Sequence, residues 1–168
     1  MKTIMNPILS KAGKGLAKIV LFCSVLAPVS LPAANATSQS RLDIGDNFGG
    51  GKVAYIFKQG DHGYVAGQTH GLIAAKGDLS YNDTWKNAMK ACREYRAGGF
   101  SDWRLPKKDE LPRLYSNRFE IGGFKEHHYY WSGTESDLND VWDLSFVTGK
   151  RNLAYKLDHE YARPVRTF

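Results

Sequence analysis

Short apolar runs separated by glycine-rich turns occupy both ends of the chain and predict β-strands there. In the N-terminal half the runs lie at 52–57, 64–66 and 72–75. In the C-terminal half they lie at 129–132, 141–146, 153–157 and 162–168. The last run ends at Phe168, and we expect it to tie the C-terminus into a sheet beside the first strand.

Apolar residues recur at helical spacing between these two groups of strands. The first predicted helix runs from about Asp83 to Ala97, with Asp83 as its N-cap and Gly98 as its stop. The second is shorter, from about Glu110 to Asn117, with Pro112 in its first turn, where a missing N–H costs little. The apolar face of the first helix consists of Trp85, Ala88, Met89, Cys92 and Tyr95.

The stretch 98–111 joins the two helices and carries the densest local signals in the chain. Its two leading glycines end the first helix, Trp103 and Leu105 are placed to enter a core, and Pro106 stops the extended piece. We interpret it as a scaffold rather than a catalytic loop. The order of strands, two helices and strands predicts an α+β domain, with a mostly antiparallel sheet flanked by two helices.

The first 36 residues have the composition of a secretory signal peptide. Four lysines without an acidic residue precede the apolar run 19–32, and Ala34-Asn35-Ala36 supplies a small-x-small cleavage site. Pro28 and Pro32 interrupt the apolar run, which favours a cleaved leader over a retained membrane anchor. We therefore expect an exported protein, periplasmic or secreted to the cell surface, with a flexible extension at 37–43 and a single domain at 44–168.

Removal of this leader changes the charge and cysteine content. The whole chain has a formal net charge of +6, but the leader holds four of the 23 basic residues and none of the 17 acidic ones. The remaining charge of +2 gives little support for a nucleic-acid partner. Cys92 is the one cysteine left, so an internal disulfide is excluded, and its place on the apolar helix face predicts a buried, inert thiol.

No motif of a common enzyme class is present. The sequence lacks a Gly-x-Ser-x-Gly elbow and a His-Glu-x-x-His helix, and Gly50-Gly51-Lys52 fails as a phosphate loop because Val53 follows in place of a hydroxyl residue. The adjacent His127 and His128 would point to opposite faces of a strand, which makes them a poor pair of zinc ligands. We expect a protein that is not an enzyme and has no cofactor.

One acidic segment offers oxygen ligands of the kind that calcium takes. The candidates are Asp137, Asn139 and Asp140, with Asp143 close behind. The alternative is a solvated loop in which Asn139 and Asp140 occupy turn positions. The sequence favours the solvated loop.

Basic residues gather around the second predicted helix and at one predicted hairpin tip. An anionic polysaccharide requires several such cations on one surface, with aromatic side chains for additional contacts. The alternative is an ordinary solvated surface, with the four tryptophans Trp85, Trp103, Trp131 and Trp142 in the core. The candidate ligand-binding residues are Lys107, Lys108, Arg113, Arg118, Lys125, Tyr129, Lys150 and Arg151.

Several sequence blocks in a fixed order resemble one known family. The blocks include 44–51, 70–75, 99–111, 117–124, 130–135 and 163–166, with Gly99-Phe100-Ser101-Asp102-Trp103-Arg104-Leu105-Pro106 the longest of them. Together they resemble the C-terminal domain family of the Legionella collagen-like adhesin, the Lcl C-terminal domain. The resemblance runs from about Ile44 to Phe168.

This resemblance implies a C-type-lectin-like α+β fold, similar also to formylglycine-generating enzymes. The oxidation that those enzymes perform needs a pair of cysteines, and Cys92 stands alone after cleavage. The collagen-like adhesin is directed to sulfated glycosaminoglycans and assembles as a trimer. The present chain has no Gly-X-Y stalk.

Together these observations predict an exported, non-enzymatic binding module for a glycan, anionic or sulfated, or for a protein at the bacterial envelope or host surface. A structural or interaction subunit of an envelope assembly is the alternative, and an enzyme of unrecognised chemistry is less favoured. We expect no membrane span after cleavage of the leader. The sequence leaves a homo-oligomer open.

Overall fold

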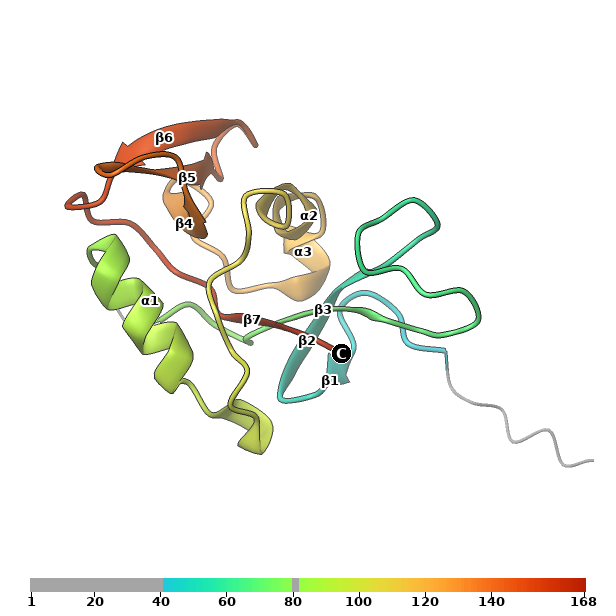
Figure 1. The fold of residues 1–168 in the computed structure, drawn as a ribbon. Helices are drawn as coiled ribbons and strands as arrows, with labels where there is room; N and C mark the ends of the chain where they lie inside the picture. Colours follow the sequence, from blue (N-terminus) through green and yellow to red (C-terminus); the bar gives the residue numbers. More distant parts are fainter. Residues whose placement is uncertain (1–40, 80–81) are drawn as a thin grey trace, which may run out of the picture. The chain divides into compact units, whose positions relative to one another are not determined.

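Two antiparallel sheets carry the strands of the computed structural model, which describes residues 41–79 and 82–168 (Figure 1). The first sheet has the order β1-β2-β3-β7 and the second the order β4-β5-β6. The strands are β1 Asn47–Phe48, β2 Gly51–Ile56, β3 Gly71–Ala74, β4 Tyr129–Glu135, β5 Asp140–Ser145, β6 Arg151–Tyr155 and β7 Val165–Thr167. The helices are α1 Trp85–Glu94, α2 Leu111–Ser116 and α3 Arg118–Ile121, with a 3-10 turn at Ala97–Gly99.

The predicted α+β class is confirmed, with two differences in detail. The antiparallel strands form two sheets instead of one, and a third short helix, α3, follows α2. The predicted signal peptide and residues 37–40 lie outside the described residues, so cleavage and export stay predictions. Within the described ranges, no helix is long and apolar enough to cross a membrane.

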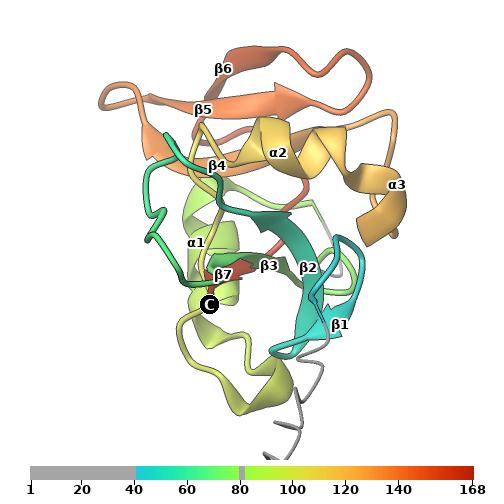
Figure 2. The same ribbon diagram turned by 90° about the vertical axis from the view of Figure 1, so that its right-hand side faces the viewer.

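The β4-β5-β6 sheet is covered by a helix on each face (Figure 2). Tyr130 and Leu144 oppose each other across β4 and β5 and pack with Leu111 and Leu114 of α2. The next residue of β4, Trp131, points to the other face and packs with α1. Strand β4 therefore contributes side chains to two core clusters, one on each face of the sheet. The residues of α1 in this second cluster are Trp85, Ala88 and Cys92.

The C-terminal strand β7 joins the first sheet, as expected, but beside a different strand. It pairs with β3, placing Ile73 opposite Arg166, and not with the first strand of the sheet. All four residues of β3 are buried, because β2 and β7 flank it and side chains cover both of its faces. A central strand that is buried on both faces is usually a continuous apolar run, as the residues 71–74 are.

The stretch between α1 and α2 enters the core as predicted. Trp103 and Leu105 are buried, and the ring of Trp103 meets that of Tyr95 edge to face at 5.1 Å. Gly98 has a φ of 67°, and a Cβ there would stand 2.6 Å from the Gly50 Cα. Only glycine allows this backbone conformation and this close approach together.

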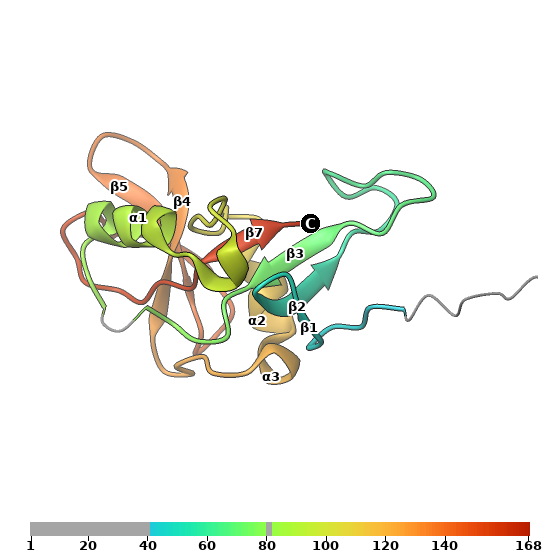
Figure 3. The same ribbon diagram turned by 90° about the horizontal axis from the view of Figure 1, so that it is seen from below.

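The loop from Phe57 to His70 differs from the prediction. Tyr64-Val65-Ala66 was expected to form a strand, but it lies among turns in a loop that projects beyond β2 and β3 (Figure 3). Gly60, Gly63 and Gly67 all have positive φ in this loop, and such a density of left-handed residues interrupts strand pairing. The loop nevertheless has a fixed base. Its Asp61 accepts hydrogen bonds from the Tyr55 hydroxyl and the Lys58 N–H.

Candidate functional site

Five of the eight predicted ligand-binding residues lie around α2 and the turn between β5 and β6. We call them the basic surface: Lys107, Lys108, Arg118, Lys150 and Arg151. Two contacts connect its parts. The Arg151 guanidinium pairs with Asp109 just before α2 at 2.9 Å, and the Lys108 ammonium lies 5.2 Å from the centre of the Trp142 ring on β5.

A half-exposed apolar strip continues beside the basic surface. Trp142 on β5 opposes Leu153 on β6, so both side chains point to the sheet face that α2 covers only in part. Tyr155, two residues further along β6, points the same way. Leu153 is 50% and Tyr155 46% exposed. We call Trp142, Leu153 and Tyr155 the apolar strip.

Trp142 therefore departs from the prediction that all four tryptophans lie in the core. Trp85, Trp103 and Trp131 are buried, whereas Trp142 is only partly covered. The difference arises because α2 begins at Leu111 and does not extend over Trp142. The Lys108 side chain lies over the Trp142 ring instead. An ammonium above an aromatic face is a favourable contact at such a distance.

The carboxylates near the basic surface are already neutralised. Glu110 receives two hydrogen bonds from the Arg104 guanidinium, at 2.7 and 2.8 Å. Burial opposes the charged form of Glu110, but Arg104 outweighs it and holds the pKa of Glu110 below its usual value. Among the described residues, no carboxylate forms an ion pair with Lys107, Lys108 or Lys150. These ammonium groups are available to an anionic ligand.

Arg118 and the β5–β6 turn meet through one aromatic ring. The Arg118 guanidinium lies 4.2 Å from the centre of the Tyr115 ring, and it donates a hydrogen bond to the Tyr115 carbonyl oxygen. On the turn, Gly149 approaches the same ring so closely that a Cβ would stand 2.5 Å from Cε1. Glycine is thus required at 149, and the Tyr115 ring contacts both this turn and Arg118.

The other three predicted residues lie elsewhere. The Arg113 guanidinium points to the Phe57–His70 loop, where it pairs with Asp61 at 2.8 Å and stacks on Tyr55 at 4.3 Å. Lys125 follows α3, and its backbone N–H donates to the Tyr130 hydroxyl. Tyr129 opposes Ser145 and faces away from α2. These three residues therefore lie apart from the basic surface.

The calcium candidates form a turn. The Asp137 carboxylate accepts hydrogen bonds from the N–H groups of Asn139 and Asp140, each at 2.8 Å, and these bonds lower its pKa. The Lys156 ammonium binds the carbonyl oxygens of Asp137 and Leu138 and so places a cation beside the turn. In the part of the chain that the structure describes, no group of three or more His, Cys, Asp or Glu side chains is arranged to hold a metal ion.

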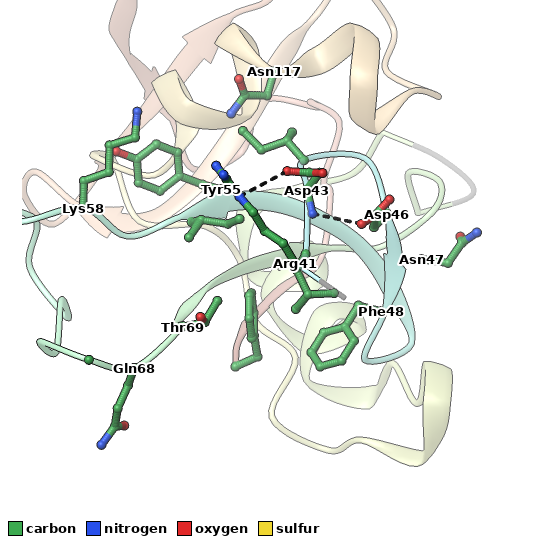
Figure 4. Close-up of a pocket in the computed structure, with 15 residues that line it drawn as sticks. Arg41, Asp43, Asp46, Asn47, Phe48, Tyr55, Lys58, Gln68, Thr69 and Asn117 are labelled. Carbon is green, nitrogen blue, oxygen red and sulfur yellow. Dashed lines mark hydrogen bonds and ion pairs between the residues drawn. The ribbon is translucent and has the colours of Figure 1, made fainter. Parts of the chain in front are cut away.

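A second candidate site is an open groove of about 1540 Å³ at the far end of the first sheet (Figure 4). One wall is the segment 41–48, and the other is the loop at 67–69. Asn117 borders it from the α2–α3 corner and donates a hydrogen bond to the Ala54 carbonyl oxygen. The remaining lining residues are Tyr55, Ile56, Lys58 and Phe168.

Sequence reasoning missed this groove. Its walls come from segments that are far apart in the chain, and β1 is only two residues long. The one signal in the sequence was the aromatic residue Phe48 directly before the glycine turn, because an aromatic side chain at a sheet edge usually packs against another apolar group. The structure supplies Phe168, whose ring meets that of Phe48 edge to face at 5.2 Å.

The sequence analysis named Asp143 beside the calcium candidates but did not pair it with Glu160, and the structure shows the two carboxyl groups as a largely buried pair. Asp143 is almost fully buried, and Glu160 has an oxygen, Oε2, without a hydrogen-bond partner in the described part of the chain. Burial and the neighbouring Asp143 charge raise the pKa of Glu160 to about 9. The pair therefore holds one proton between its two carboxyl groups at neutral pH.

Cys92 has the environment that its helix position predicts. It is buried between α1 and the second sheet, and burial raises the pKa of its thiol to about 12. The thiolate is the reactive form of cysteine. Cys92 therefore serves packing.

Comparison with known proteins agrees with the motifs. Residues 57–166 match the family described as the Lcl C-terminal domain, so the resemblance seen in the sequence is confirmed. The chain is also similar to the crystal structure of botrocetin, with 12% sequence identity, 62% of this chain and 95% of that chain covered, and a TM-score of 0.42. A search of curated proteins finds no match.

Proposed function

The chain belongs to the Lcl C-terminal domain family, and from this premise we propose that it is an exported, non-enzymatic binding module for an anionic glycan, one that carries sulfate or carboxylate groups. The observation that carries the proposal is the meeting of the basic surface with the apolar strip. Cations would pair with the acidic groups of such a glycan, and Trp142 and Tyr155 would contact the apolar faces of its sugar rings.

The arrangement of charges favours an anionic ligand over a neutral one. Lys107 and Lys150 are exposed, and Lys108 and Arg151 are held in place by Trp142 and Asp109. Pre-positioned cations lose less conformational freedom on binding than free ones do.

The proposal is tested by the affinity of the purified protein for heparin, as a sulfated glycan, in a salt gradient. A variant with Lys107, Lys108 and Lys150 changed to Ala should bind about tenfold more weakly, since three exposed ion pairs are together worth ~1–2 kcal/mol. The matched control changes Lys86, Lys90 and Arg93 to Ala on the exposed side of α1. It removes the same charge from a different face.

If the two variants lost equal affinity, heparin binding would depend on overall charge alone, and the proposed site would be wrong. Binding in the parent protein should also weaken as salt rises, because exposed charges are screened. A glycan that bound equally well at low and high salt would contradict the role of the cations.

The same proposal assigns no chemical step to the protein. Support comes from the basic surface, whose charged groups are lysines and arginines, with no nucleophile placed beside a base. Incubation with heparin should leave its chain length unchanged by size-exclusion chromatography. Depolymerisation would overturn this part of the proposal.

A further inference from the structure

The groove contains an unfinished sheet edge. β1 pairs with only the first residues of β2, in the pairs Asn47–Lys52 and Phe48–Gly51. The Gly45 N–H still donates to the Val53 carbonyl oxygen at 2.8 Å, and beyond this bond the chain leaves the sheet. The second half of β2 therefore has β3 on one side and the groove on the other (Figure 4).

The hydrogen-bond pattern shows which backbone groups face the groove. Phe57 donates its N–H to the His70 carbonyl oxygen, and Gly71 exchanges both of its bonds with Phe168 of the C-terminal strand. In an antiparallel pair, successive residues point their N–H and C=O groups to alternate sides. Ile56 opposes Gly71 and so directs both of its groups away from β3. Among the described residues, neither group has a hydrogen-bond partner.

The side chains around Ile56 suit an extended polypeptide. Phe48, 42% exposed, and Phe168 supply apolar surface to the lining, and Asn47, Gln68 and Thr69 border the groove as polar residues. The ends carry opposite charges, with Lys58 at one and Asp43 and Asp46 at the other, and Figure 4 shows this separation. Arg41 crosses the middle and pairs with Asp43 at 3.7 Å, but the two side chains are 90% and 73% exposed, so this pair is weak and can be exchanged for a charge of the ligand.

We propose that this groove binds an extended peptide segment of a partner protein, which adds as a short strand beside Ile56. The peptide would offer one backbone donor and one acceptor to Ile56 and apolar side chains at alternate positions to Phe48 and Phe168. Its acidic residue would lie near Lys58 and its basic residue near Asp46, which fixes the direction of the chain.

The proposal goes beyond the glycan site and does not depend on it. The groove is lined in part by residues that precede the family match at 57, and the residues of the basic surface do not line it. A sugar polymer is the weaker occupant, because it would satisfy neither the alternation of side-chain positions nor the paired donor and acceptor of Ile56. With both sites occupied, the protein would connect a glycan to a second protein.

The test begins with a displayed library of random nine-residue peptides, selected on the full protein. We expect an enriched pattern with apolar residues at alternate positions and a charge of opposite sign at each end. A synthetic peptide of that pattern is then added, and amide hydrogen exchange is measured. The Ile56 N–H, which exchanges quickly in the free protein, should slow at least tenfold when peptide is bound.

Two variants make the result specific. Phe48→Ala should weaken peptide binding at least tenfold, while Lys58→Glu should select peptides with a basic residue in place of the acidic one. Because Lys58 is exposed, its substitution tests the groove without disturbing the core. Both variants should bind heparin like the parent, and the Lys107, Lys108 and Lys150 variant should bind peptide like the parent.

Three outcomes overturn the proposal: no enriched pattern, enriched peptides that leave Ile56 exchange unchanged, or peptide binding that is competed by heparin. The last would assign the peptides to the basic surface. Loss of heparin binding in the Lys107, Lys108 and Lys150 control bears on the glycan site alone, so the two proposals fail separately.

Discussion

Two buried polar pairs hold this fold in opposite ways. Arg163 is fully buried and pairs with Asp78 at 2.7 Å, while it also donates to the carbonyl oxygens of Ala75 and Gly122. Asp143 and Glu160 are two carboxyl groups that meet without a cation. The first pair binds three loops through opposite charges. The second holds together only while one partner keeps a proton.

The pKa directions show that burial penalises both pairs. Asp78 has a raised pKa because of burial, even though Arg163 and the Tyr130 hydroxyl favour its charged form. Burial also raises the pKa of Asp143 and, with the Asp143 charge, that of Glu160. A buried ion pair is thus a means of fixing loop positions more than a source of net stability. Removal of one partner is the informative experiment in each case.

The largest effect is expected from Arg163→Met. The substitution keeps most of the side-chain volume but leaves Asp78 buried without its cation, so the free energy of unfolding should fall by about 3–5 kcal/mol. Denaturant unfolding measures it. Adding Asp78→Asn to the variant should recover part of the loss, because no uncompensated charge remains. A double variant that is less stable than the single one would contradict this account.

The next effect belongs to Glu160→Gln and depends on pH. The raised pKa of Glu160, about 9, means that the folded state keeps a proton which the unfolded state releases near its ordinary pKa. The stabilising contribution of the protonated form is therefore complete below about pH 4.5 and is lost as pH rises through 9. Glutamine cannot ionise, so the Glu160→Gln variant should not lose this stability as the pH rises.

Thermal or denaturant unfolding at pH 5 and pH 9 measures the difference. The Glu160→Gln variant should match the parent at pH 5 and exceed it by ~2 kcal/mol or more at pH 9. Glu126→Gln, at an exposed carboxyl, is the control and should leave the pH dependence unchanged. Parallel pH profiles for parent and Glu160→Gln would disprove the shared proton.

A smaller effect is expected from Tyr130→Phe. The Tyr130 hydroxyl donates to Asp78 at 2.6 Å and accepts from the Lys125 N–H at 2.7 Å, so its removal leaves two polar groups without a partner. The free energy of unfolding should fall by ~1–2 kcal/mol in denaturant titrations, while the ring contacts remain. Tyr129→Phe, on the exposed neighbour, should change it by less than ~0.5 kcal/mol.

These pairs also mark the limit of what the sequence predicts. Local patterns were sufficient for α1, α2 and the buried tryptophans Trp85, Trp103 and Trp131, since helical spacing acts over a few residues. The predicted caps of α1 differ, because the helix begins after Thr84 and ends at Glu94 with Tyr95 as its C-cap, before Gly98. Arg163 and Asp78 are 85 positions apart, and no local pattern selects one carboxylate for that arginine. Pairings of this kind depend on tertiary structure.

The basic residues in and around α2 show the same limit. Lys107, Lys108 and Arg118 lie around α2, but Arg113, only five residues from Arg118, points to Asp61, 52 positions earlier in the chain. The groove could not be predicted from the sequence for a related reason, because its two walls and the Phe48–Phe168 contact join segments from opposite ends of the domain. Composition and spacing identify candidates, whereas long-range contacts decide which of them share a surface.

The smallest effect on stability is expected at Arg151–Asp109, which is an exposed ion pair, in contrast to the two buried pairs. Its side chains are 45% and 69% exposed, and a pair in water contributes little, so Asp109→Asn should change the free energy of unfolding by less than ~0.5 kcal/mol. The same substitution releases the Arg151 guanidinium and removes an acidic group from the basic surface. Heparin affinity should therefore rise, by about two- to threefold, in the salt gradient that tests the glycan site. Weaker heparin binding by a stably folded Asp109→Asn protein would show that Asp109 holds Arg151 in its binding position, and the basic surface would then depend on that pair for its geometry.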